Sequence, residues 1–127
     1  MRTAGDGLPA AGPTARTLGA RREIDVLVAD DGMVVGGGGG MSVAPDSPMH
    51  LPAHRRPPAY DGTGKDPVWE LDVTELGNEL VYREDPLMPG VHGFIEPARR
   101  MTFDSYQYAL LQTRGAWRLP SADDGNH

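Results

Sequence analysis

The residues best suited to chemistry in this sequence are a histidine and a glutamate in one short extended run, Val91–Glu96. Successive side chains of a β-strand point to opposite faces, so His92 and Glu96 are predicted to share a face. A histidine beside a carboxylate can act as an acid, as a base or as a group that orients a ligand. The same pair can equally be a half-buried histidine with a hydrogen-bond partner, and the spacing does not separate these two interpretations.

A second candidate feature is a run of five glycines, residues 36–40, that leads directly into Met41 and Ser42. Glycine lacks the Cβ atom that would hold a ligand away from the backbone, so Gly39, Gly40, Met41 and Ser42 are candidate cofactor-binding residues. Ser42 adds a hydroxyl that can both donate and accept hydrogen bonds. The alternative interpretation is that residues 36–40 are a flexible connector. The glycine pattern by itself favours this alternative.

Two further histidines are four residues apart, a spacing that would place both on one face of a helix. Pro52 lies between His50 and His54 and is incompatible with a regular helix. No acidic residue has helical spacing to either histidine. We therefore expect no metal site and interpret both as exposed loop histidines.

Composition narrows the function classes. The chain has 127 residues, the size of one domain, and its lack of cysteine excludes disulfides, thiolate metal sites and cysteine nucleophiles. A formal net charge of -6 argues against nucleic acid as the main partner. No apolar run approaches the length of a membrane-spanning helix, and residues 1–22 lack the apolar core of a signal peptide. We expect a cytoplasmic protein that does not contact a membrane.

The elements that must position these residues are short. Residues 1–22 are rich in Gly, Ala, Pro, Thr and Arg and predict a flexible N-terminal segment, followed by an ordered domain over 23–119. A flexible tail is predicted over 120–127. A strand over 24–28 and a second over 33–35, separated by an Asp-Asp-Gly turn, predict a hairpin.

The second half of the domain is better patterned. A proline-rich loop is expected over 44–67, and strands are expected over 68–71, 80–82 and 91–96. Thr102 is a favourable N-cap for a helix that ends near Gly115. The apolar face of that helix is predicted to contain Phe103, Tyr106, Leu110 and Leu111, with Trp117 packing back onto it. The expected fold class is α+β.

Over about two thirds of its length the chain resembles the Tse-two family, cytotoxic effectors exported by bacterial type VI secretion. The family's fold is a small antiparallel sheet with a C-terminal helix, like that of ADP-ribosyltransferases. No single stretch is diagnostic, and the likeness is an ordered combination of segments. These segments are Val28–Met33 leading to Gly39–Val43, Val73–Leu76 with Leu80, and Val91–Ala98 continuing to Met101.

The resemblance implies a site in which the threonine-serine turn and the strand histidine of the family fall on Met41, Ser42 and His92. Met41 departs from it, since a thioether cannot donate a hydrogen bond. The arginine-bearing strand that opens the family has no counterpart within residues 1–22. Glu96 is this sequence's own feature, and a carboxylate there could stabilise the cationic sugar formed as nicotinamide leaves NAD.

These inferences combine into one functional hypothesis and two rivals. The hypothesis is an NAD-dependent toxin with catalytic residues His92, Ser42 and Glu96, an unknown cytosolic target and a cognate immunity protein that neutralises it. The first rival is a catalytically inactive binding module of the same fold. The second is an RNA-cleaving or RNA-modifying toxin that uses His50, His54, His92 and the arginines. The negative net charge disfavours this rival.

Overall fold

The computed structural model describes residues 1–120 and confirms the α+β class. Of the tail predicted over 120–127, only Pro120 lies within the described residues. Among these residues no helix is both long and apolar enough to cross a membrane. The strands are β1 (Met33–Val34), β2 (Met41–Val43), β3 (Leu80–Glu84), β4 (Gly93–Pro97) and β5 (Met101–Thr102). The α-helix is α1 (Phe103–Gln112). Single turns of 3-10 helix are η1 (Pro48–His50), η2 (Ala53–Arg55), η3 (Pro58–Tyr60), η4 (Val73–Glu75) and η5 (Arg114–Ala116).

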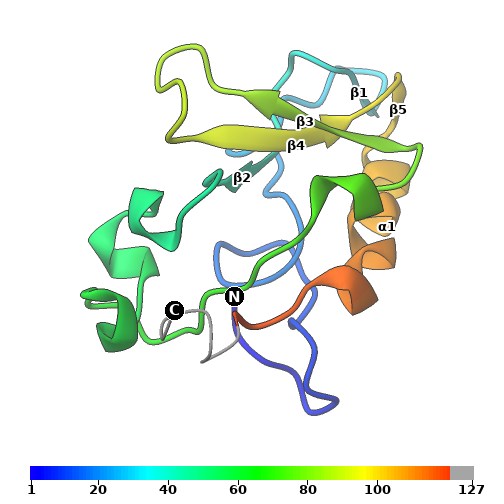
Figure 1. Ribbon diagram of the computed structural model, residues 1–127. Coiled ribbons are helices and arrows are strands. Elements are labelled where there is room, and N and C mark those ends of the chain that lie inside the picture. Colours follow the sequence, from blue (N-terminus) through cyan, green and yellow to red (C-terminus); the bar gives the residue numbers. More distant parts are fainter. Residues whose placement is uncertain (121–127) are drawn as a thin grey trace.

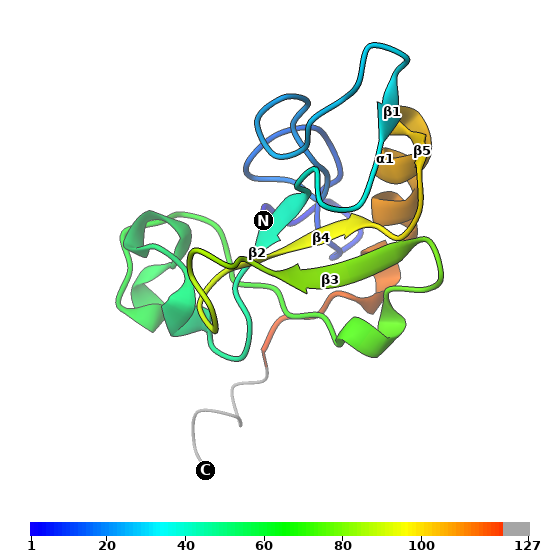
Figure 2. The ribbon, with the colours of Figure 1, turned by 90° about the horizontal axis from the view of Figure 1, so that it is seen from above.

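Two antiparallel sheets make up the β structure. The larger sheet has the order β2-β4-β3, and Figure 2 shows β4 between its two neighbours. The smaller sheet pairs β1 with β5 beside the start of the helix. Because β4 is the central strand, its side chains are flanked on both sides, and the register of β4 decides which residues meet.

Helix α1 forms where the capping pattern predicts it. The Thr102 hydroxyl accepts a hydrogen bond from the Ser105 N–H at 3.0 Å, and Asp104 lies in the first turn, at the positive end of the helix dipole. Tyr106 and Leu110 are fully buried, as predicted. Leu111, predicted on the same face, is 39% exposed, because it is rotated about 100° from Leu110 around the helix axis.

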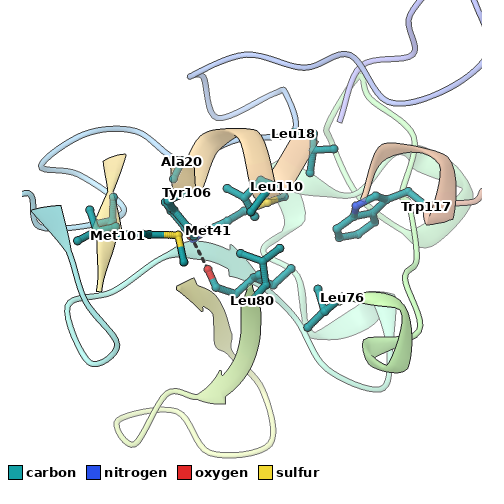
Figure 3. Packing of buried hydrophobic residues seen from close by; sticks show 13 residues of the cluster. Leu18, Ala20, Met41, Leu76, Leu80, Met101, Tyr106, Leu110 and Trp117 are labelled. Atoms are coloured by element: carbon teal, nitrogen blue, oxygen red, sulfur yellow. Dashed lines mark hydrogen bonds between the residues drawn. The ribbon is translucent and has the colours of Figure 1, made fainter. Parts of the chain in front are cut away.

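The hydrophobic core lies between α1 and the larger sheet (Figure 3). The Tyr106 hydroxyl joins the two layers, since it donates to the carbonyl of Ile95 in β4 and accepts from the N–H of Met41 in β2 at 3.0 Å. Trp117 is 7% exposed and packs into the cluster, which confirms its predicted place. The core thus fixes β2 and β4 relative to the helix.

The N-terminal segment is packed against the domain, which corrects the flexible segment predicted over residues 1–22. Leu18 and Ala20 are members of the core cluster. The side chain of Gln107 on α1 binds both the N–H and the carbonyl of Ala20 at 2.8 Å. Arg114 forms two hydrogen bonds of 2.7 Å with the carboxylate of Asp6. These long-range contacts leave no signature in local composition.

The hairpin predicted over 24–35 is wrong. Residues 24–28 form no strand, and only an isolated bridge joins Val26 to Gly39. The Asp25 carboxylate accepts hydrogen bonds from both the backbone and the guanidinium of Arg21, which turns the chain there. β1 pairs with β5 instead of with this segment. The proline-rich stretch does form a loop, with the short turns η1, η2 and η3 at the left of Figure 1.

Candidate functional site

The register of the larger sheet brings the predicted site residues to one face. Ser42 in β2 and Arg83 in β3 both lie opposite Phe94 in β4. Side chains alternate along a strand, so these three point away from the core face, on which Met41 and Ile95 are buried. We call the surface formed by Ser42, Arg83, His92 and Phe94 the serine-histidine face.

His92 lies one residue before β4 and is oriented by a carboxylate. Its Nδ1 is 2.8 Å from Oδ2 of Asp85, and its carbonyl accepts a 3.0 Å hydrogen bond from the Asp85 N–H. The imidazole also contacts the edge of the Phe94 ring, with centroids 4.9 Å apart. Because the carboxylate accepts from Nδ1, the opposite nitrogen, Nε2, is left as the imidazole's reactive atom. The side chain of His92 is 29% exposed, so part of the imidazole is in contact with solvent.

Asp85 is the partner that the sequence pattern did not identify. Its hydrogen bond from His92, with a further one from the Leu87 N–H, lowers the pKa of this carboxyl below its ordinary value. The carboxylate is therefore charged at neutral pH and holds the imidazole in one tautomer. The turn between β3 and β4 brings Asp85 and His92 together. Predicting that turn from the sequence would have identified Asp85 as the partner of His92.

Ser42 and His92 are neighbours without being hydrogen-bonded to each other. Ser42 lies opposite Phe94, and His92 is two residues before Phe94, just outside β4. Ser42 is exposed. Among the described residues its hydroxyl has no hydrogen-bond partner within the protein. A ligand that spans these two positions could contact both side chains.

Glu96 shares this face by alternation, yet the structure corrects its predicted catalytic role. Its side chain is only 2% exposed. Oε1 accepts hydrogen bonds from Nε of Arg83 at 2.6 Å and from the N–H of Gly37 at 2.9 Å. The glycine run covers the carboxylate, so it cannot face a substrate. The Glu96 carboxylate holds the guanidinium of Arg83 against the face. The Arg83 side chain is 56% exposed.

The cofactor-binding glycines are also corrected. A Cβ atom on Gly39 would lie 2.5 Å from the carbonyl oxygen of Asp25, and one on Gly40 would lie 2.2 Å from that of Ile95. Glycine is needed here because protein backbone, rather than a ligand, approaches closely. Met41 is buried on the core face, 8% exposed. Of the four residues predicted to bind a cofactor, Ser42 is exposed, Gly39 is half-buried, and Gly40 and Met41 are buried.

The hollows found on the described surface lie away from the serine-histidine residues. Two surface hollows stand out in the described part of the chain, and neither is lined by Ser42, His92 or Glu96. Within residues 1–120, no group of three or more His, Asp or Glu side chains could hold a metal ion. The functional features of the face are therefore a hydroxyl, an oriented imidazole, an aromatic ring and a guanidinium.

Comparison with known proteins does not assign this chain to a family. No family model, curated protein or solved structure matches this chain. The fold and the face together define a small α+β protein with an aspartate-oriented histidine on an antiparallel sheet. Function must be inferred from that geometry.

Proposed function

We propose that this chain is an NAD-dependent toxin of the ADP-ribosyltransferase-like class that binds NAD on the serine-histidine face. The observation that carries the proposal is that Ser42 lies opposite Phe94, whose ring contacts the His92 imidazole, so that residues far apart in sequence share one face of the sheet. The Asp85 carboxylate gives His92 a fixed orientation. A protein with this activity needs a neutralising immunity protein in the cell that makes it.

The residue types on the face fit a dinucleotide. The Ser42 hydroxyl can bond the hydroxyls of the nicotinamide ribose, and the Phe94 ring offers an apolar surface to a base. The guanidinium of Arg83 uses Nε for Glu96, and its remaining N–H groups suit the diphosphate. When bound, NAD supplies a sugar carbon whose nicotinamide leaves with the electron pair of the glycosidic bond.

His92 and Asp85 are suited to handling the proton of the acceptor. A nucleophilic group on the target must lose a proton as it bonds to the sugar, and the free Nε2 can take that proton. The imidazolium formed is stabilised by the Asp85 carboxylate, which already accepts from Nδ1 at 2.8 Å. Asp85 is thus a positioning residue, and His92 is the residue that touches the reacting group.

Expression in bacteria tests this function. We expect the unmodified chain to slow growth and His92→Ala to restore it. His50→Ala is the matched control, since that histidine bonds only the Pro45 carbonyl, in a loop away from the serine-histidine face. Equal growth of the unmodified and His92→Ala cultures, with both proteins accumulating to the same level, would contradict the proposal.

A second candidate is a binding module without catalysis, and one observation favours it. The only glutamate on the face, Glu96, is closed off by Arg83 and Gly37, so no free glutamate is shown to oppose the positive charge of the reacting sugar. An assay for nicotinamide release from NAD separates the two candidates. The toxin releases nicotinamide and loses this activity in His92→Ala, whereas the binding module releases none.

A further inference from the structure

A separate cluster of cations lines a hollow between the proline-rich loop and the N-terminal segment. Arg16, His54, Arg55 and Lys65 line this hollow, which has a volume of about 330 Å³. Among residues 1–120, Asp66 is the one acidic side chain in its lining. We call this site the cationic hollow.

Its charge balance differs from that of the rest of the described surface. Three permanent cations, Arg16, Arg55 and Lys65, face one carboxylate, in a protein whose formal net charge is -6. The charge of Arg2 also acts on Asp66. Arginines elsewhere are mostly matched one to one with a carboxylate, in the pairs Arg21–Asp25, Arg83–Glu96, Arg99–Glu79, Arg100–Asp31, Arg114–Asp6 and Arg118–Glu70.

Backbone contacts build the hollow from three segments. The N–H of Thr63 donates to the carbonyl of Ala53 at 2.9 Å, and a Cβ atom on Gly64 would lie 2.6 Å from the carbonyl oxygen of His54. Glycine at position 64 therefore lets the two segments of the loop approach each other, which places Lys65 beside His54. NH1 of Arg55 donates to the carbonyl of Ala15 at 3.2 Å and attaches the N-terminal segment.

Several donors remain available to a ligand. Arg16 binds Asp66 through Nε and NH2 at 2.7 and 2.8 Å, and this contact lowers the pKa of the Asp66 carboxyl. That carboxylate is therefore charged and offsets a single cation. Arg55 uses one N–H for Ala15, and Lys65 is exposed, with no hydrogen bond within residues 1–120. Unmatched guanidinium and ammonium groups around one hollow are the donor set that binds phosphate oxygens.

We propose that the cationic hollow binds a phosphate or diphosphate group, either free or carried by a nucleotide. It shares no residue with the serine-histidine face and does not depend on the function proposed there. Inorganic pyrophosphate and ATP separate the two sources. Equal affinity for both assigns the free anion, and tighter binding of ATP assigns a nucleotide.

Calorimetry with pyrophosphate tests the site. We expect saturable binding that weakens as NaCl is raised, because the interaction is between exposed charges. Lys65→Gln should weaken the binding roughly tenfold, as for the loss of one charge-assisted hydrogen bond. This substitution is at an exposed side chain that makes no hydrogen bond or ion pair within residues 1–120, so the fold is expected to persist. Arg55→Gln should have the same effect.

Arg118→Gln is the matched control, since this arginine lies outside the hollow and pairs weakly with Glu70, at 3.9 Å. It should bind pyrophosphate as the unmodified protein does. The proposal is overturned if the unmodified protein gives no binding at millimolar pyrophosphate, or if Lys65→Gln and Arg118→Gln bind equally. Failure here would leave NAD binding by the serine-histidine face unchanged, because Lys65 does not contact that face.

Discussion

Nδ1 of His92 lies 2.8 Å from Oδ2 of Asp85, across the turn that joins β3 to β4. This contact fixes the imidazole tautomer and directs the free nitrogen away from the hairpin. The Phe94 ring packs against the imidazole in a T-shaped arrangement, with centroids 4.9 Å apart. In the function proposed above, this fixed orientation would prepare His92 for proton transfer before a substrate binds.

The first prediction concerns the aspartate of this pair. Asp85→Asn replaces a charged acceptor by a neutral amide, so the imidazolium formed during reaction is no longer stabilised. We expect the rate of nicotinamide release to fall about 10- to 100-fold, within the range that acid-base groups contribute. The pH profile of the remaining activity should shift, which a merely structural role would not cause.

Asp72→Asn is the control for this variant. Asp72 also accepts hydrogen bonds from a neighbouring residue, Thr74, yet it caps the turn η4 rather than a histidine. Its replacement should leave the rate and the pH profile as they are. Comparable losses in both variants would show that Asp85 acts only through folding.

The second prediction concerns acid stability. Hydrogen bonds from Arg114, Arg16 and His92 lower the pKa values of Asp6, Asp66 and Asp85 in the folded protein. A carboxyl with a depressed folded pKa contributes stability above its unfolded pKa and loses it as the pH falls through the folded pKa. The melting temperature should therefore decrease on acidification below about pH 4, where these groups take up protons.

Circular dichroism melts over a pH series measure this effect. Asp6→Asn should flatten the acid limb of the curve, since it removes one of the groups that titrate. A melting temperature that stays constant or rises on acidification would mean that these ion pairs do not stabilise the fold.

The third prediction compares two glutamates. Glu96→Gln keeps the shape of a buried side chain but removes the charge that binds Arg83, and should destabilise the fold by about 1–3 kcal/mol. Glu79→Gln breaks a pair with Arg99 in which both side chains are half exposed, and should change stability by about 0–1 kcal/mol. Urea denaturation measures both values. Equal effects would contradict the structural role assigned to Glu96.

The fourth prediction concerns the link between the helix and the sheet. Burial raises the pKa of the Tyr106 hydroxyl well above its ordinary value, so this group remains a neutral donor. Tyr106→Phe leaves the Met41 N–H and the Ile95 carbonyl without that partner, and should destabilise the protein by about 1–3 kcal/mol. Tyr108→Phe, at a residue that is 63% exposed, should be close to neutral in the same denaturation experiment.

Part of the fold followed from local pattern, although the strand predicted over 68–71 is replaced by an isolated bridge between Glu70 and Arg118. The capping threonine and apolar spacing located α1, and the alternation around Ile95 located β4. The N-terminal segment could not be predicted in this way, because Leu18 and Ala20 are held by residues of α1 that are distant in sequence. The strand predicted over 24–28 failed because the Arg21–Asp25 contact turns a segment of high β-propensity.

The site was partly predictable for a related reason. Alternation placed His92 and Glu96 on one face, but it carries no information about what covers that face. The glycine run covers Glu96 and leaves His92 open. Asp85 and Arg83 come from β3 and its turn, so their contacts appear only once the register of β3 against β4 is known.

Calorimetric titration with NAD tests the central claim most directly. Saturable binding is expected for the unmodified chain, with a loss of affinity of roughly tenfold or more in both Ser42→Ala and His92→Ala. Ser105→Ala, an exposed serine on α1, should bind as the unmodified chain does. Absence of binding, or equal affinity in all four proteins, would contradict an NAD site on the serine-histidine face.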